Sequence, residues 1–174
     1  MSSVLKVNEI QHTNGSTALT IDSSGFVAPK VPALSIKWVT GNQTLTSNVW
    51  TAVDWSTYGS VELDNVGGWD GANERWTPAV AGWYYVNFVF TTGAGSIRAA
   101  GARVMKNGAS TIENTFFVAA ESYGDDLSIT ASGLIQMNGT SDYMSTEGYC
   151  YDSVAGSDVA TTYTRFDAFL VTAS

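Results

Sequence analysis

The chain is short of cysteine, histidine and basic residues, and these shortages exclude whole classes of protein. Among 174 residues Cys150 is the only cysteine, so an internal disulfide cannot form and a disulfide-stapled secreted scaffold is excluded. Lys and Arg number 8 against 16 Asp and Glu, which gives a net charge of −8. Nucleic acid requires clustered basic residues, so we expect no nucleic-acid partner.

Long apolar runs are also missing. No run approaches the roughly 18 residues of a membrane span, so we expect no membrane insertion. The opening Met1-Ser2-Ser3 lacks the basic and then apolar layout of a secretory signal, which predicts folding in the cytoplasm. Hydrophobic residues nevertheless make up 44% of the chain, enough to form one core.

Good helix formers are sparse, whereas Val, Thr, Ile and aromatic residues are frequent, and this composition favours strands. The clearest strand is 83–92, where alternation assigns one face to the core: Tyr84, Val86, Phe88 and Phe90. The opposite face carries Trp83, Tyr85, Asn87 and Val89. That face is too apolar to be left in water, so a second layer or another subunit must cover it.

Further strands are predicted at short intervals: 35–40, 61–63, 97–106, 111–119, 127–137, 143–151 and 162–172. Asn107-Gly108 and Asn138-Gly139 each stand between two of them. Because Asn-Gly adopts positive φ readily, both are predicted to form tight hairpin turns. A series of short strands without intervening helices indicates an all-β fold, an antiparallel β-sandwich.

The N-terminal residues differ from the rest of the chain. Two short alternating strands, 5–10 and 18–22, cannot bury enough surface to be stable alone. They must pack on the sandwich, on copies of themselves or on a larger assembly. Pro29 and Pro32 indicate an extended linker. We therefore divide the chain into an N-terminal segment with its linker, 1–32, and a main domain, 33–174.

Several motifs of the main domain occur together in one known family. They are Gly68-Trp69-Asp70, the run from Trp76-Thr77-Pro78 to Gly82-Trp83-Tyr84, the hairpin tip Lys106-Asn107-Gly108, and the closing strand from Thr164 to Val171. In this order they resemble the jelly-roll domain of complement-type globular heads and tumour-necrosis-factor ligands. The resemblance implies a jelly-roll β-sandwich that assembles as a homotrimer.

The N-terminal segment carries a second resemblance. Gln11-His12-Thr13-Asn14-Gly15 and the run from Thr20 to Gly25 are similar to a segment that recurs in tail-fibre and appendage proteins of tailed bacteriophages. This resemblance implies a virion protein, assembled in the host cytoplasm. Its residues 1–30 would bind other virion proteins, and its distal domain would contact something outside the particle.

The outward-facing aromatic residues give a separate reason to expect a trimer. The last strand repeats the two-sided pattern of 83–92, because Phe166 and Ala168 alternate with Arg165 and Asp167. Exposed rings on two strands of one sheet would form a larger patch than a monomer tolerates, and association about a threefold axis would bury them. The predicted interface residues are Tyr85, Val89, Phe169 and Val171.

The sequence does not predict an enzyme. His12, the only histidine, lies in a polar turn without partners for a catalytic triad or a metal site. Cys150 lies in an aromatic strand with no adjacent base to lower its pKa, so we expect a buried, inert thiol. Asp125 and Asp126 are adjacent and would point opposite ways in extended chain, which argues against the paired carboxylates of a glycosidase.

Three acidic loops are candidates for a hard cation. Their carboxylates are Asp64, Asp70 and Glu74, then Glu121, Asp125 and Asp126, then Asp152 and Asp158. Calcium takes several oxygen ligands from flexible loops, but this spacing matches no EF-hand. No cofactor is therefore predicted, and calcium is kept as an alternative.

Aromatic residues in loops are better candidates for function. A ring face stacks on the apolar face of a sugar, while polar neighbours bind the sugar hydroxyls. The predicted receptor or glycan site consists of Trp69, Tyr58, Asp70 and Asn73. Trp50 and Trp55 occur in the same region, and we interpret them as core or interface packing.

The combined hypothesis is a structural virion protein, a homotrimeric phage tail fibre or spike whose jelly roll attaches to a receptor on the host surface, a glycan. Two alternatives belong to other classes. One is a capsid decoration or head-fibre protein with no receptor role. The other is a soluble carbohydrate-binding module, which leaves the N-terminal segment unexplained.

Overall fold

The computed structural model describes residues 9–11, 17–21, 23–25, 27–29, 31–93, 97–117, 126–152, 157–158 and 163–174. The chain divides into two compact units, Met1–Val31 and Pro32–Ser174. The first contains a three-stranded antiparallel sheet of β1 (Glu9–Gln11), β2 (Thr17–Ile21) and β3 (Val27–Pro29). Pro29 therefore ends an edge strand instead of belonging to the predicted linker, and an edge tolerates its missing N–H.

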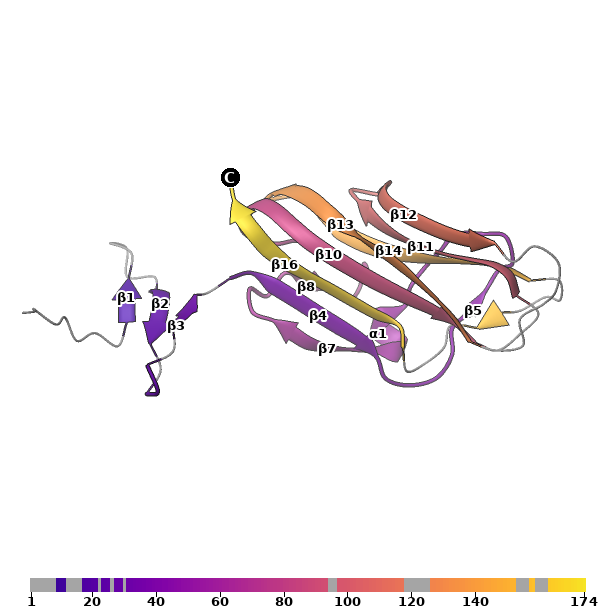
Figure 1. Ribbon diagram of the computed structural model, residues 1–174, viewed down its shortest axis with the longest axis horizontal. Coiled ribbons are helices and arrows are strands. Elements are labelled where there is room, and N and C mark those ends of the chain that lie inside the picture. Colours follow the sequence, from indigo (N-terminus) through magenta and orange to yellow (C-terminus); the bar gives the residue numbers. More distant parts are fainter. Residues whose placement is uncertain are drawn as a thin grey trace, which may run out of the picture. The chain divides into compact units, whose positions relative to one another are not determined.

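The second unit, hereafter the head, is a jelly roll of two antiparallel sheets (Figure 1). The five-stranded sheet has the order β13 (Leu127–Asn138), β10 (Ala81–Thr92), β16 (Arg165–Ala173), β4 (Ala33–Trp38) and β7 (Gly59–Asp64). The six-stranded sheet contains β12 (Ala109–Phe117), β11 (Ile97–Lys106), β14 (Met144–Asp152), β9 (Arg75–Trp76), β8 (Trp69–Asp70) and β6 (Thr51–Ala52). A short pair, β5 (Thr44–Leu45) with β15 (Ser157–Asp158), completes the strands.

The core lies between the two sheets and follows the predicted alternation. The four residues predicted to face the core from β10 are completely buried: Tyr84, Val86, Phe88 and Phe90. Phe88 packs edge-on against Phe166 of the neighbouring strand, at 6.5 Å between ring centroids. Cys150 is buried on the facing side, as expected for a core thiol. Removing these large side chains from water supplies most of the stability of such a sandwich.

The motif that precedes β10 fixes how the chain enters the core. Trp76 is buried and meets the ring of Tyr84 edge-on, with centroids 5.6 Å apart. The Tyr84 hydroxyl donates to the Val80 carbonyl at 2.8 Å, and burial raises its pKa to about 12. A Cβ at Gly82 would lie 2.3 Å from the Thr172 carbonyl oxygen, so glycine permits β10 to approach β16 here.

One helical turn, α1 (Trp55–Tyr58), interrupts the strands and was not expected from the sequence. The Asp54 carboxylate accepts the Thr57 N–H at 2.9 Å, and Glu74 accepts the N–H groups of Trp55 and Ser56 at 3.1 and 3.0 Å. These bonds satisfy the free donors of the helix start. Within the described residues no helix is long or apolar enough to cross a membrane.

The two Asn-Gly pairs behave differently. Asn107 and Gly108 have φ of 53° and 78° and close the tight β11–β12 hairpin, as predicted. The prediction for Asn138-Gly139 is wrong, because β13 and β14 belong to different sheets. The Asn138 side-chain oxygen accepts three successive N–H groups, from Thr140, Ser141 and Asp142, at 2.9 to 3.0 Å. That wider turn carries the chain across the sandwich.

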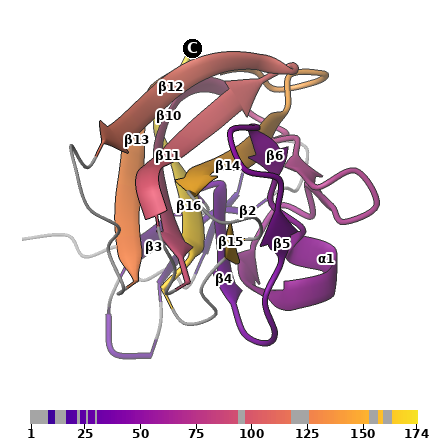
Figure 2. The same cartoon turned by 90° about the vertical axis from the view of Figure 1, so that its right-hand side faces the viewer.

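Strand register gives the head a near end and a far end. Phe169 pairs with Ala33, and Gly82 with Ala173, so the chain enters and leaves the head at one end, here the near end. Thr92 pairs with Leu127 at the far end. Figure 2 looks onto the far end of the strands.

We predict that Gly148→Ala destabilises the head. An added Cβ would lie 2.2 Å from the ring of Phe90, which is enclosed on all sides by the core. Overpacking of this kind costs about 1–3 kcal/mol, measurable by urea unfolding. Gly71→Ala is the control, since its Cβ would meet no atom closer than 3.3 Å. An equal loss of stability in both variants would contradict the packing explanation.

Candidate interaction surfaces

An apolar row crosses the outer face of the five-stranded sheet. Register places Leu134, Tyr85, Phe169 and Ala33 side by side on four successive strands. The first three are exposed by 53%, 36% and 46%, and the rings of Tyr85 and Phe169 lie 5.5 Å apart. Trp83 of β10 is also exposed. A contiguous apolar surface of this kind on a soluble protein marks an interaction site.

The structure places three of the four predicted interface residues on or beside this row and Val89 away from it. Tyr85 and Phe169 are its central members. Val171 is exposed and occupies a bulge, because Tyr84 pairs with Leu170 while Trp83 pairs with Thr172. Val89 is half-buried and lies farther along β10, opposite Arg165. The apolar row therefore contains Leu134, which was not predicted, and does not contain Val89.

Towards the far end the same face is ionic. Lys37 pairs with Glu62, Arg165 contacts Asp167 at 2.9 Å, and the Ser35 hydroxyl donates to Asp167 at 2.7 Å. The hydrogen bond from Lys37 holds the pKa of Glu62 below its ordinary value, and Arg165 adds to this. The charges satisfy one another, so this part of the face needs no external counter-ion.

The predicted glycan residues are each engaged by contacts within the head. Tyr58 stacks on Trp38, with 4.8 Å between ring centroids and 11° between planes. Trp69 is half-buried and packs against the core from β8. Asp70 accepts from the Asn73 side chain at 2.7 Å and lies 3.3 Å from Arg75. These contacts lower the pKa of Asp70, the Asn73 bond most.

The acidic loops do not form a metal centre in the part of the chain that the structure describes. There, no group of three or more His, Cys, Asp or Glu side chains gathers to hold an ion. Asp64 instead accepts the N–H groups of Gly67 and Trp69, at 3.0 and 2.9 Å. His12, Glu121 and Asp125 lie outside the described residues, as do the side chains of Asp152 and Asp158.

Glu74, another carboxylate of the acidic loops, also has a structural role. Burial raises the pKa of this carboxyl, and the nearby Asp54 adds to the effect, although N–H groups from α1 oppose it. The hydrogen bonds of Asp54 to Thr57 and Ser56 outweigh its own burial and lower its pKa. Glu74 therefore fastens the loop at residues 71–74 to α1, whose first turn Asp54 caps.

A third surface, on the outer face of the six-stranded sheet, was missed by sequence reasoning. The Trp50 ring lies over the Arg103 guanidinium at 4.4 Å and beside Tyr149 at 5.2 Å between centroids. A Cβ at Gly101 would come within 2.7 Å of the indole, so glycine makes room for it. Tyr151, two residues along β14, is 40% exposed. Alternation around Cys150 was the available signal for the two tyrosines.

Polar contacts fix this third surface in place. The Tyr149 hydroxyl donates to the Asn48 side-chain oxygen at 2.7 Å, and the Asn48 N–H donates to the Cys150 carbonyl at 2.8 Å. Asn48 has a φ of 64°, the left-handed conformation that asparagine tolerates. Arg103 bonds to Glu147 and lies 3.7 Å from Glu113. Trp50 is therefore held by both its loop and the strands beneath it.

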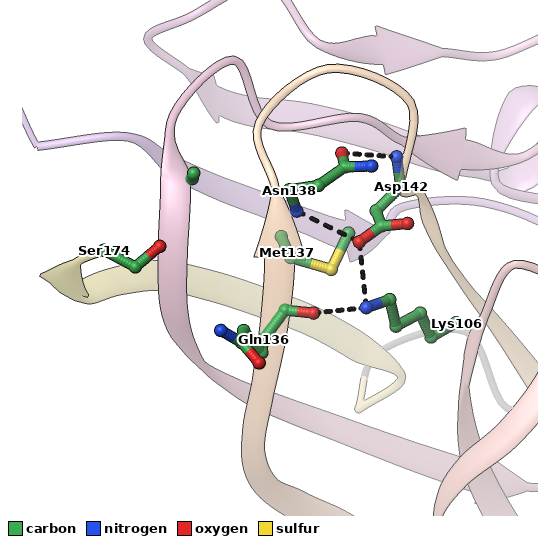
Figure 3. A pocket seen from close by; sticks show the side chains of 7 residues that line it. Lys106, Gln136, Met137, Asn138, Asp142 and Ser174 are labelled. Atoms are coloured by element: carbon green, nitrogen blue, oxygen red, sulfur yellow. Dashed lines mark hydrogen bonds and ion pairs between the residues drawn. The ribbon is translucent and has the colours of Figure 1, made fainter.

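A shallow cavity of about 390 Å³ lies at the near end (Figure 3). Within it the Lys106 ammonium donates to the Gln136 carbonyl at 2.6 Å and lies 2.8 Å from Asp142. Asp142 also accepts the Asn138 N–H at 3.0 Å and the Asn107 side-chain amide at 2.8 Å. The bonds from Lys106 and Asn107 lower the pKa of Asp142. The cavity's charged groups thus join two turns to each other.

Solved structures share this architecture. The chain is similar to the globular domain of the zebrafish complement 1qA protein, with a TM-score of 0.59 and 18% identity over 83% of this chain and 99% of that one. It is also similar to Eiger TNF from S. frugiperda (TM-score 0.59, 7% identity, 83% and 94% covered). Murine APRIL gives a TM-score of 0.59 at 9% identity, with 81% and 99% covered.

These comparisons establish a fold and nothing finer. No protein-family model matches the chain, and no curated protein matches it in sequence. At such low identities a shared fold does not carry function with it. The predicted fold class is confirmed: the head is an all-β jelly roll of the complement and tumour-necrosis-factor type.

We predict that Asp142→Asn lowers the free energy of unfolding by about 1–2 kcal/mol at pH 7, because Lys106 loses its ionic acceptor. The pKa of Asp142 in the fold lies below its ordinary 3.8. Its carboxylate therefore stabilises the fold above pH 3.8, and this contribution disappears as pH falls through the folded-state pKa. Denaturant unfolding from pH 7 to pH 3 should show the two proteins converging on acidification.

Asp126→Asn is the matched control, because Asp126 is exposed just before β13. Its stability should stay within about 0.5 kcal/mol of the wild type at every pH. A stability difference for Asp142→Asn that is constant or grows as the pH falls would refute the ionic role of Asp142.

Proposed function

We propose that the protein is a homotrimeric virion protein of a bacteriophage, a tail fibre or spike. In this proposal residues 1–30 bind the particle and the head attaches to a receptor on the host surface. The observation that carries the proposal is the apolar row on the outer face of the five-stranded sheet. The inner face of that sheet is already filled by the core, and the row is exposed among the residues that the structure describes.

Other copies of the chain are the simplest partner for this row. The row spans four strands and provides a flat apolar area. The charged groups beside it are paired within the subunit, so a partner surface needs no matching charge. The sequence resemblance to complement and tumour-necrosis-factor heads implies three copies. An obligate interface of this type buries on the order of 2,000 Å² or more.

The end at which the chain enters the head supports a role in attachment. The chain enters at the near end, where the Leu170 N–H donates to the Pro32 carbonyl at 3.0 Å, and the C-terminus lies at the same end. A protein fixed to a particle by its N-terminal segment therefore has its far end free. Val39 and Tyr163, which flank the hydrogen-bonded Trp38 and Thr164 there, are both exposed.

A capsid decoration protein is the second candidate, and it shares the trimer and the N-terminal anchor. It differs in having no receptor. Binding of the isolated trimer to host cells, measured by flow cytometry with labelled protein, separates the two candidates. Absence of binding to any susceptible host would favour decoration over attachment.

We predict that Tyr85→Asp dissociates the trimer. The aspartate would stand between Leu134 and Phe169, where burial of an unpaired carboxylate costs several kcal/mol per subunit. Sedimentation velocity at micromolar concentration should show a trimer for the wild type and a monomer for the variant. Tyr151→Asp, at an equally exposed aromatic residue of the other sheet, should remain trimeric. A wild type that sediments as a stable folded monomer would refute the proposed assembly.

We predict that deletion of residues 1–30 prevents incorporation into the particle. In phage carrying the deletion, the truncated chain should be made in the infected cell but be missing from purified virions by immunoblot. The full-length chain provides the positive control in the same preparation. Incorporation of the truncated chain at the normal level would exclude the N-terminal segment as the anchor, and a soluble carbohydrate-binding module would then be favoured.

A further inference from the structure

We propose that the outer face of the six-stranded sheet binds a neutral glycan at an aromatic surface, here the Trp50 surface, made of Asn48, Trp50, Glu147, Tyr149 and Tyr151. The inference rests on the proposed attachment function and supplies its ligand class and its site. If the five-stranded sheet carries the contacts between copies, the opposite sheet faces outward in each subunit. The Trp50 surface is then present three times and stays accessible.

The rings of this surface are held in position before any ligand arrives. Gly101 leaves space for the edge of the Trp50 indole, and Arg103 and Tyr149 flank the ring at 4.4 and 5.2 Å. The Tyr149 hydroxyl is tied to Asn48. A rigid aromatic site loses little side-chain entropy when it binds, so more of the contact energy appears as affinity.

Hydrogen-bonding groups around the rings are available. Glu147 uses only Oε2 to hold Arg103, and within the described residues its Oε1 has no hydrogen-bond partner. The Asn48 side-chain nitrogen and the Trp50 indole nitrogen likewise make no hydrogen bond to the described residues. One acceptor and two donors beside aromatic rings match a sugar, which offers hydroxyl groups and an apolar C–H face.

Charge selects a neutral sugar over an acidic one. Arg103, the basic residue over the Trp50 ring, is matched by two carboxylates, those of Glu147 and Glu113. This group of three charges at the Trp50 ring is therefore net negative, within a chain whose net charge is −8. Sialylated, sulfated or phosphorylated sugars would bring a second negative charge to this surface and be repelled.

The loop at Trp69 is less suited to the same ligand. Asp70 is engaged by Asn73 and Arg75, which occupies the polar groups that would bind hydroxyls. Tyr58 has one ring face stacked on Trp38. Trp69→Ala is consequently a matched control, an aromatic truncation on the same head outside the Trp50 surface.

The test uses the full-length protein on an array of glycans ending in glucose, galactose, mannose or N-acetylglucosamine, beside sialylated and sulfated counterparts. The wild type should bind one or more neutral glycans and no acidic one. Tyr151→Ala, at an exposed side chain that the fold does not need, should weaken that binding at least tenfold. Trp50→Ala should abolish it, and Trp69→Ala should stay within about twofold. Sedimentation velocity and circular dichroism confirm that each variant is still a folded trimer.

The remaining outcomes each refute part of the scheme. Binding that is lost in Trp69→Ala but kept in Tyr151→Ala would overturn the Trp50 surface as the site. Binding to acidic glycans alone would overturn the ligand class. An array without signal, from a trimer that still binds host cells, would refute the glycan inference and leave attachment standing. A trimer that binds neither glycans nor cells would refute attachment itself.

Discussion

The head depends on one strand, β10, that is apolar on both of its faces. An antiparallel sandwich usually keeps one face of each sheet in water, and its strands alternate apolar with polar residues. On β10 the inward residues form the centre of the core, yet Trp83 and Tyr85 are also exposed on the outward side. The neighbouring strands continue this pattern with Leu134 and Phe169. The core is complete without these outer rings, so they remain available for contact with another molecule.

The second sheet meets water in a different way. On its outer face the central strand has small residues, Gly101 among them, and Arg103 is neutralised there by carboxylates on both adjacent strands. Trp50 reaches this face from a loop and not from a strand, and it depends on Gly101 for space. The two outer faces therefore differ in kind. One is a flat apolar row, and the other is a polar surface with rings fixed on it.

The fold and the core can be predicted from the sequence more completely than the interaction sites can. Alternation over 83–92 predicts the buried face because large side chains at every second position have only one way to leave water. The same dipeptide, Asn-Gly, closes a hairpin at Asn107 but begins a crossing between sheets at Asn138. The type of turn depends on whether the next strand pairs with the preceding strand or joins the other sheet. The contact of Trp50 with Gly101 joins distant parts of the chain, and no local pattern encodes it. The single turn of α1 is too short to show a helical period, so only its capping by Asp54 and Glu74 reveals it.

Charge is scarce in this chain, 14% of residues, and its placement bears on both surfaces. The network of Lys37, Glu62, Arg165 and Asp167 borders the apolar row on the far-end side, and the carboxylates of Glu113 and Glu147 border the Trp50 surface. Paired charges beside an apolar patch resist its sliding to another register, because a shifted contact would remove these ion pairs from water. A face bounded in this way favours one defined arrangement of copies over open-ended association. The proposed trimer would in turn hold three copies of the opposite surface at fixed spacing, the condition under which weak individual contacts add to a strong attachment.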